Sequence, residues 1–286
     1  MYGKNNFMFK YYKTMIRCPT CKETPVHTTN VRECYGNDFR VDLKPLGKGD
    51  VGIAYLINAV SPPKQEMYPD ANYKKYVLKQ VQFRIGDDGT YDADAEKFLN
   101  ETCIGIEMGE LGIAPRIYEC WLCSDAKGNE YGYYTMDRIA KILTNEYPGN
   151  PRKLKEGQHL RAAPRDIQQK IVGLLEVMIN AGYVHNDNHP GNIGIMADGE
   201  PVLFDFGFAL KADHELTEFD KLQALGFALY QIIEQYDKDI TYDDDGVFYD
   251  LIYLIRQNEY KFGSHIGFLK HYNDSSNSSG VSSMEM

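Results

Sequence analysis

The sequence predicts an α+β fold in two parts, with five strands and one helix first and a mainly helical half after them. Apolar residues alternate with polar ones in several segments of the first half, as in half-buried strands. In the second half the apolar residues recur at helical spacing instead. A chain of 286 residues is long enough for one two-lobed domain or for two small ones.

The strands are indicated by alternation and by the turns between them. Phe39, Val41 and Leu43 alternate with polar residues, and a glycine cluster follows them. A polar, proline-containing insert separates the second strand from the third, and the turn-forming residues 125–129 join the last two. We expect strands at residues 39–43, 53–57, 76–81, 116–122 and 131–139.

The helices are indicated by apolar residues three and four positions apart and by the residues that end each helix. Gly112 and Pro115 close the first helix, and Gly182 closes the second. A hairpin with an Asp198-Gly199 turn follows the second helix. We expect helices at residues 92–111, 166–181, 219–236 and 247–255, and hairpin strands at 193–196 and 202–204.

The charge and the apolar residues exclude several classes of partner. The formal net charge is -10 and the pI is near 5.2, which argues against a nucleic acid as the main partner. No segment approaches the roughly 20 apolar residues that span a bilayer. Residues 1–17 lack the apolar core of a secretory signal. We therefore expect a cytoplasmic protein whose cysteines are reduced.

The cysteines allow two interpretations. Cys18, Cys21, His27 and Cys34 could supply four zinc ligands, although their spacing fits no finger pattern, and the question stays open. Cys120 and Cys123 lie three apart in a predicted strand, where their side chains face opposite ways. This second pair is expected to be buried free thiols.

A glycine-rich stretch lies between the first two predicted strands. Gly47, Gly49 and Gly52 form a G-x-G-x-x-G pattern, and glycines let backbone N–H groups approach phosphate oxygens. A plain glycine turn is the alternative. A dinucleotide fingerprint would lead into a helix, whereas these glycines lead into a strand. The candidate phosphate-contacting residues are Leu46, Gly47, Lys48, Gly49, Asp50, Val51, Gly52, Ile53 and Ala54.

Lys79 lies on the next predicted strand and could neutralise phosphate. A lysine on a strand is ordinarily a solvated charge, so this role requires an anchoring carboxylate. The following helix offers Glu96, Glu101, Glu107 and Glu110. We prefer Glu101 because it lies in the middle of the helix, with Glu107 as the alternative.

The strongest signal is a set of polar residues around the hairpin. Asp187 could orient an acceptor hydroxyl and take its proton. Asn192 and Asp205, on either side of the hairpin, offer one neutral and one charged oxygen to a hard cation such as Mg²⁺. The alternative is that these residues cap turns and that His185 lies in the core. Together and in this order, they predict a phosphoryl-transfer site.

These motifs resemble the protein-kinase-like superfamily over residues 39–272. Val77-Leu78-Lys79 resembles the third kinase strand, and Phe204-Asp205-Phe206-Gly207 resembles the metal-binding motif. The resemblance implies a two-lobed fold with a five-stranded antiparallel N-lobe and a helical C-lobe. The N-lobe would be residues 37–137 and the C-lobe residues 138–272. Residues 1–36, which show no clear period, are interpreted as an N-terminal extension, and the serine-rich tail at 273–286 is expected to be disordered.

The resemblance also implies roles for the site residues and implies ATP with Mg²⁺, or Mn²⁺ as an alternative metal. The glycines would cover the phosphates, Lys79 would hold the α- and β-phosphates, and Glu101 would pair with Lys79. Asp187 would be the catalytic base, and Asn192 and Asp205 would bind the metal. Backbone groups of Asp137 and Ile139, in the hinge segment, would bind the adenine.

The chain departs from ordinary serine/threonine kinases at several positions. Asn186 replaces an arginine that reads activation-loop phosphate, and His189 replaces a lysine that contacts the transferring phosphate. The segment between Asp205 and Asp220 is short and lacks A-P-E, and Val51 replaces an aromatic residue at the loop tip. The H-x-D-x-H-P-x-N loop resembles RIO-like and aminoglycoside-kinase branches, and the compact chain resembles kinases of large DNA viruses.

Three functions stay open at this point. We expect a monomeric serine/threonine protein kinase that acts on protein hydroxyls, with no nucleic-acid or membrane partner, in a host cytoplasm or a virion if viral. A small-molecule kinase of the aminoglycoside or choline type is the alternative, favoured by His189-Pro190 and by the short segment after Asp205. A nucleotide-binding scaffold without activity ranks third, because Lys79, Asp187 and Asp205 are all present.

Overall fold

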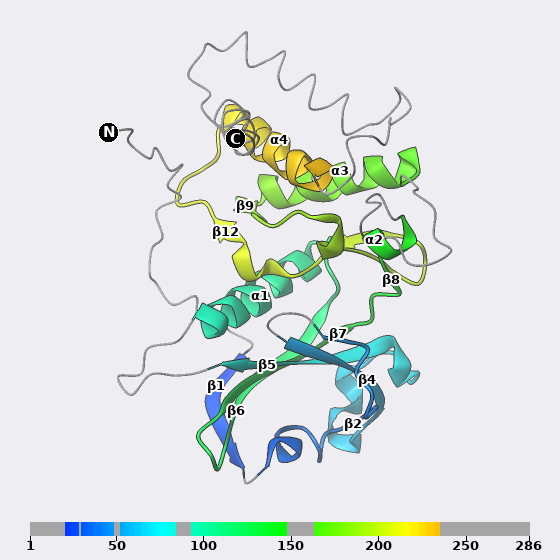
Figure 1. Cartoon of the computed structure of the whole chain (residues 1–286), viewed down its shortest axis with the longest axis vertical. Helices are drawn as coiled ribbons and strands as arrows, with labels where there is room; N and C mark the ends of the chain where they lie inside the picture. The colour runs from blue at the N-terminus through cyan, green and yellow to red at the C-terminus, as the bar shows by residue number, and fades with distance from the viewer. Residues whose placement is uncertain (1–20, 29, 49–51, 84–92, 148–162, 235–286) are drawn as a thin grey trace, which may run out of the picture. The chain divides into compact units, whose positions relative to one another are not determined.

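The computed structural model in Figure 1 describes residues 21–28, 30–48, 52–83, 93–147 and 163–234. The chain divides into two compact units. The first unit combines residues Met1–Ile142 with Asn192–Leu210, and the second combines Leu143–Gly191 with Lys211–Met286. The expected helix at 247–255 and the expected disordered tail lie outside the described residues.

A twisted sheet forms the body of the first unit, in the order β1-β6-β7-β5-β4-β2, with β3 paired to β4 (Figure 1). Every pair of neighbours is antiparallel except β1 and β6. The α+β fold with an antiparallel sheet is therefore confirmed. Its strands are β1 (Cys21–Thr28), β2 (Phe39–Val41), β3 (Gly47–Lys48), β4 (Gly52–Val60), β5 (Tyr76–Phe83), β6 (Ile117–Asp125) and β7 (Glu130–Asp137).

Two of these strands were not expected. β3 lies within the glycine stretch, and β1 lies in the segment that we interpreted as an N-terminal extension. β1 runs parallel to β6, and its register shifts between Lys22 and Val26. Pro25 lies within this shift and has no N–H to donate to the ladder, which accounts for the irregularity. The N-terminal segment thus adds an edge strand to the sheet.

One face of the sheet is covered by α1 (Ala93–Glu110). Phe98 of α1 packs with Val81 of β5, Leu122 of β6 and Tyr134 of β7 in one buried cluster. A Cβ at Gly132 would lie 2.6 Å from the Phe98 ring, so only glycine lets the helix approach this closely. The face of the sheet that carries Lys79 is therefore fixed against α1.

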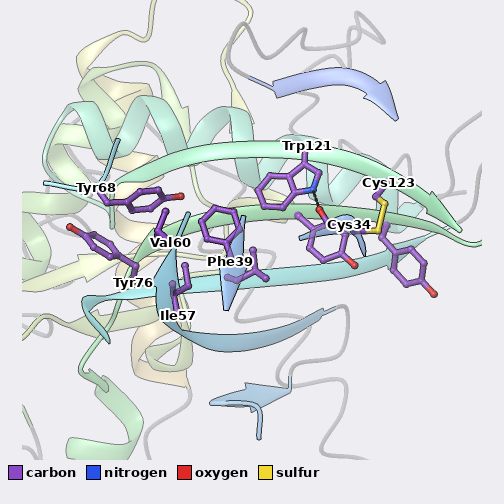
Figure 2. Close-up of a cluster of buried hydrophobic side chains, with 11 residues drawn as sticks. Cys34, Phe39, Ile57, Val60, Tyr68, Tyr76, Trp121 and Cys123 are labelled. Carbon is purple, nitrogen blue, oxygen red and sulfur yellow. Dashed lines mark hydrogen bonds between the residues drawn. A yellow bond between two sulfur atoms is a disulfide. The ribbon is translucent and has the colours of Figure 1, made fainter. Parts of the chain in front are cut away.

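The opposite face carries an aromatic core (Figure 2), to which the N-terminal segment and the proline-containing insert both contribute. The Phe39 and Trp121 rings stack with their centroids 5.8 Å apart. The insert contains η2 (Pro62–Met67) and η3 (Tyr73–Lys75), and it buries Tyr68 against the sheet. Tyr68 Oη donates to Glu119 Oε1 at 2.9 Å. The insert is polar in composition but supplies part of the core.

A disulfide joins Cys34 to Cys123, so the expectation of a free thiol at Cys123 is wrong. Cys34 ends η1 (Val31–Cys34), and the Trp121 indole N–H donates to its carbonyl oxygen at 3.0 Å. This contact brings the two Cα atoms within 5.9 Å, a span that a disulfide bridges. Cys120 is also disulfide-bonded, and Cys103 is the free cysteine within the described part of the chain. Because its sulfur is bonded to Cys123, Cys34 cannot serve as a zinc ligand.

Replacing Cys34 with alanine should destabilise the first unit. The bond closes a loop across a sequence separation of 89 residues, and losing such a cross-link costs about 2–5 kcal/mol. Urea unfolding of Cys34→Ala and of Cys34→Ala/Cys123→Ala should give the same lowered free energy, since either change removes the same bond. A single variant as stable as the wild type would show that the bond contributes nothing to stability.

The second unit contains the long helices α3 (Arg165–Asn180) and α4 (Glu218–Glu234), which lie side by side (Figure 1). Ile171, Leu175 and Met178 of α3 are buried at helical spacing, as are Leu225, Leu229 and Ile232 of α4. Gly182 has φ 83°, the left-handed conformation that ends a helix after its last turn. The helices predicted at 166–181 and 219–236 are confirmed to within two residues.

The remaining elements are short. The hairpin predicted after the second helix is confirmed as an antiparallel pair, and Gly199 in its turn has φ 92°. No helix within the described ranges has both the length and the hydropathy that crossing a bilayer requires. The short elements are β8 (Lys141–Ile142), α2 (Leu143–Glu146), β9 (Tyr183–Val184), β10 (Ile193–Ile195), β11 (Pro201–Leu203) and β12 (Leu210–Lys211).

Candidate functional site

A buried ion pair joins β5 to α1 in the first unit. Lys79 Nζ contacts Glu101 Oε1, and the two side chains are only 19% and 9% exposed. Of the four acidic residues that the sequence offered, it is thus Glu101 that pairs with Lys79. Tyr134 Oη donates to the same Glu101 oxygen at 2.6 Å, and the Lys79 ammonium lies 5.6 Å from the centre of the Tyr134 ring.

The charges of Lys79 and Glu101 also interact with the carboxylate of Asp205. Burial alone would lower the pKa of Lys79, but the carboxylates of Glu101 and Asp205 outweigh burial and raise it. Burial raises the pKa of Glu101, and the Asp205 carboxylate adds to this effect, while Lys79 and Tyr134 oppose it. Two carboxylates therefore hold Lys79 as a cation.

Asp205 has a backbone conformation that few residues adopt. Its φ of 64° and ψ of 62° lie in the left-handed region, which aspartate tolerates better than most side chains. The next residue, Phe206, is buried within the first unit, where its ring is a neighbour of Gly105 on α1. Left-handed non-glycine residues are strained and cluster at functional sites. The buried Phe206 supplies the packing that holds this conformation.

Asn192 belongs to the same unit as Asp205. The Asn192 side chain is buried, and its backbone carbonyl accepts a hydrogen bond from the Phe204 amide at 3.1 Å. This bond ties the start of the hairpin to the residue before Asp205. The two residues bring a carboxamide and a carboxylate, both hard oxygen ligands, so their chemistry fits Mg²⁺. The described ranges contain no group of three or more His, Cys, Asp or Glu residues that could hold a metal ion.

The glycine stretch forms the strands β3 and β4. Gly47 pairs with Ala54 and Lys48 with Ile53, and the Leu46 amide donates to the Ala54 carbonyl at 2.8 Å. A Cβ at Gly52 would lie 2.8 Å from the Gln80 carbonyl oxygen and 3.3 Å from Lys79 Cε. Glycine at 52 therefore lets this backbone pass close over the strand that carries Lys79. The predicted residues Gly49, Asp50 and Val51 lie outside the described residues.

The segment between β7 and β8 contains the two residues expected to bind adenine. The Asp137 amide donates to the Arg116 carbonyl at 3.0 Å, so this N–H has a partner within the protein. The Arg138 amide donates to Lys75 at 2.7 Å and the Ala140 amide to Ile195 at 3.0 Å. No group within the described ranges accepts a hydrogen bond from the Ile139 amide between them. The segment is thus fixed on both sides of Ile139.

Asp187 lies in the second unit, in the loop after β9. His189 Nε2 lies 3.7 Å from Asp187 Oδ2, and both side chains are more than a third exposed. The Gly191 amide donates to His189 Nδ1 at 3.0 Å. With Nδ1 as an acceptor, a neutral His189 ring carries its proton on Nε2, the nitrogen nearer Asp187. A Cβ at Gly191 would lie 2.6 Å from the ring, so glycine is required beneath it.

Sequence reasoning missed Tyr134 in this site. Tyr134 pairs with Lys79 in the register between β5 and β7, and both side chains therefore belong to the same face of the sheet. Alternation along β7 separates Tyr134 from its neighbour Tyr133, which packs in the aromatic core on the other face. The sequence contains this alternation, but the register that brings Tyr134 to Lys79 is a property of the folded sheet.

The chain is similar to kinases of known families. Residues 136–234 match the ABC1 atypical kinase-like domain. The serine/threonine-protein kinase PknD of Chlamydia caviae is 27% identical over 180 residues, which is 60% of this chain and 17% of that protein. The proteins of the same description from Chlamydia abortus and Chlamydia muridarum are 24% identical over 183 residues and 26% over 175 residues. The matched region spans 17% of the length of each of these relatives.

A kinase-like domain implies nucleotide binding in general, and the first unit offers a fitting environment. Lys79 supplies the positive charge of the buried pair, and Asn192 and Asp205 carry oxygen atoms of the kind that a hard cation binds. The match to the atypical kinase-like domain covers Asp187, Asn192 and Asp205, and the antiparallel sheet with α1 precedes it. The comparisons thus support an atypical kinase-like protein, with residues 136–234 similar to an atypical kinase-like domain.

Proposed function

We propose that the protein is an ATP-dependent serine/threonine protein kinase. The observation that carries this proposal is the buried pair of Lys79 and Glu101 in the same unit as Asp205. Kinases need this lysine, its glutamate and the metal-binding aspartate in place together before they transfer phosphate. A scaffold without activity has no need to keep a costly buried ion pair.

The first unit would bind Mg²⁺-ATP. In this proposal Glu101 holds Lys79 so that its ammonium contacts the α- and β-phosphates, while residues 46–54 lie over them. Backbone groups of Asp137 and Ile139 bind the adenine. Asn192 and Asp205 hold Mg²⁺, or Mn²⁺, which when bound neutralises charge that develops on the phosphate oxygens.

Asp187 would act on the acceptor hydroxyl. Its carboxylate accepts the hydrogen bond of a serine or threonine hydroxyl and takes the proton as the oxygen attacks the γ-phosphorus. A P–O bond to the acceptor forms, the bond between the γ-phosphorus and the bridging oxygen breaks, and ADP leaves. His189 Nε2 lies beside the carboxylate in this step, 3.7 Å from Asp187 Oδ2.

The identity of the acceptor is supported by the relatives rather than by the geometry. The Chlamydia proteins are described as serine/threonine-protein kinases, which favours a protein hydroxyl. The short chain between Asp205 and α4 and the match to an atypical domain favour a small hydroxyl compound as the second candidate. We further propose that the protein acts as a monomer in the cytoplasm, without a nucleic-acid or membrane partner.

The function is tested by incubating the purified chain with Mg²⁺ and γ-labelled ATP. Casein, a basic protein and the chain itself serve as protein acceptors, and a panel of small hydroxyl compounds is run in parallel. Acid-stable label on serine or threonine would support the protein kinase. Label on small compounds alone would favour the second candidate. Failure to label any acceptor, with ATP still bound, would contradict both.

Replacing Asp205 with alanine should abolish Mg²⁺-dependent nucleotide binding, since the charged metal ligand is lost. Calorimetric titration with ATP, with and without Mg²⁺, measures this dependence. Asp198→Ala, at the exposed hairpin turn, is the matched control and should bind ATP as the wild type does. Equal Mg²⁺ dependence in Asp205→Ala would place the metal elsewhere.

A further inference from the structure

The loop that carries Asp187 is held on both sides by one side chain of α4. Gln231 Nε2 donates to the backbone carbonyl of Asn186 at 2.9 Å. Gln231 Oε1 accepts from the backbone amide of Asn188 and from its side-chain amide, both at 3.1 Å. All of these residues belong to the second unit. The amide group of Gln231 thus contacts the residue before Asp187 and the residue after it.

The backbone at this point needs such a partner. Asn186 has φ 62°, a left-handed conformation that costs a non-glycine residue on the order of 1 kcal/mol. Asn188 is only 2% exposed, so a backbone amide at this residue that found no acceptor would be costly. Gln231 forms hydrogen bonds with both the Asn186 carbonyl and the Asn188 amide. Among the common side chains, a primary amide offers this donor and acceptor together.

Gln231 is itself held by a well-fixed helix. Ala228, Leu229 and Ile232 are buried around it, where α4 packs with α3. At the start of the same helix, Asp220 Oδ2 accepts from the Thr217 amide at 2.9 Å and from its hydroxyl at 2.6 Å. Asp220 is therefore occupied in capping α4. Gln231 lies three turns further along α4, where its side chain contacts the loop.

We propose that Gln231 is a positioning residue that sets the direction of the Asp187 carboxylate. The proposal rests on the proposed function, since Asp187 is there the base. Gln231 touches no reacting atom. It fixes the backbone on either side of Asp187, and a shift of about 1 Å in a catalytic group can cost roughly 100-fold in rate.

Three variants separate this role from a general effect on α4. Gln231→Leu removes all three hydrogen bonds. Gln231→Glu keeps an acceptor for Asn188 but turns a carboxylate oxygen toward the Asn186 carbonyl, where no hydrogen is available to bridge them. Gln223→Leu makes the leucine substitution two turns earlier on the same helix, where the Gln223 Oε1 atom is buried and has no partner among the described residues.

We expect Gln231→Leu to lower kcat by about 10- to 100-fold and Gln231→Glu by roughly tenfold or more. The KM for ATP should stay within about twofold, because the residues proposed to bind ATP belong to the first unit. Gln223→Leu should match the wild type in both constants. Unchanged kcat in a folded Gln231→Leu would overturn the proposal, as would an equal loss in Gln223→Leu.

Hydrogen exchange at the Asn188 amide tests the loop contact without any activity. This amide should exchange slowly in the wild type and much faster in Gln231→Leu, with the α3 amides unchanged. Equal exchange in the two proteins would overturn the proposal. If the wild type transfers no phosphate to any acceptor, the proposed function fails, and accelerated exchange in the variant would still support Gln231 as the residue that places Asp187.

Discussion

Asp187→Asn should lower the rate of phosphate transfer by about 10²- to 10⁴-fold, the range that a positioned general base contributes. Asparagine keeps the size of the side chain and a hydrogen-bond acceptor but cannot take the proton of the hydroxyl. The affinity for Mg²⁺-ATP should change little, because Lys79, Asn192 and Asp205 are untouched. Single-turnover transfer of γ-labelled phosphate and ATP titration measure the two quantities separately.

The matched control for Asp187→Asn removes one carboxylate at a different position. Asp198 lies exposed in the hairpin turn, so Asp198→Asn makes the same change in charge without altering the proposed base. It should transfer phosphate at the wild-type rate. If Asp187→Asn is as active as this control, Asp187 is not the base. If both variants are equally impaired, net charge and not Asp187 determines the rate.

Lys79→Met should abolish transfer and also destabilise the first unit. Removing one partner of a buried pair leaves the other charge uncompensated, which costs about 3–5 kcal/mol. Glu101 would remain buried near Asp205 with no cation between them, so repulsion adds to the loss. Urea unfolding gives the stability, and labelled transfer gives the activity.

The double variant Lys79→Met/Glu101→Leu separates these two effects. It removes both charges and should recover much of the stability, because replacing a whole buried pair by apolar groups is often neutral. Transfer should stay lost, since no cation meets the phosphates. Lys75→Met is the control: Lys75 pairs with Asp70 at an exposed site and should affect stability far less. Transfer by the double variant at the wild-type rate would remove Lys79 from the mechanism.

The sequence alone predicted those helices and strands that have a local pattern of apolar residues. The alternation at residues 76–81 and the periodicity at 166–181 both predicted elements that the structure contains, because burial of one face dictates each pattern. β1 was missed, since residues 21–28 show no clear alternation and include Pro25. Its strand conformation depends on pairing with β6, far along the chain.

The candidate site likewise contains residues that the sequence predicted and residues that it did not. Motifs contiguous in the sequence, such as Phe204-Asp205-Phe206-Gly207, could be recognised directly. Tyr134 and Gln231 could not, because each meets its partner only through a strand register or the packing of a helix. The disulfide between Cys34 and Cys123 was missed for a related reason. A spacing of 89 residues carries no local signal, and the expected reducing compartment argued against a bond.

The parallel strand β1 has a consequence for association between molecules. Without it, the nine residues of β6 would present a row of open N–H and C=O groups, a template onto which a foreign strand can add. β1 pairs with that row and becomes the edge itself, where Pro25, which has no N–H, and the register shift between Lys22 and Val26 interrupt the hydrogen-bonding groups that a foreign strand would need. At the far border of the sheet, β2 has only three residues, too short to guide such addition. Both borders of the sheet are thus protected against edge-to-edge aggregation. The N-terminal segment protects one border, and the shortness of β2 protects the other.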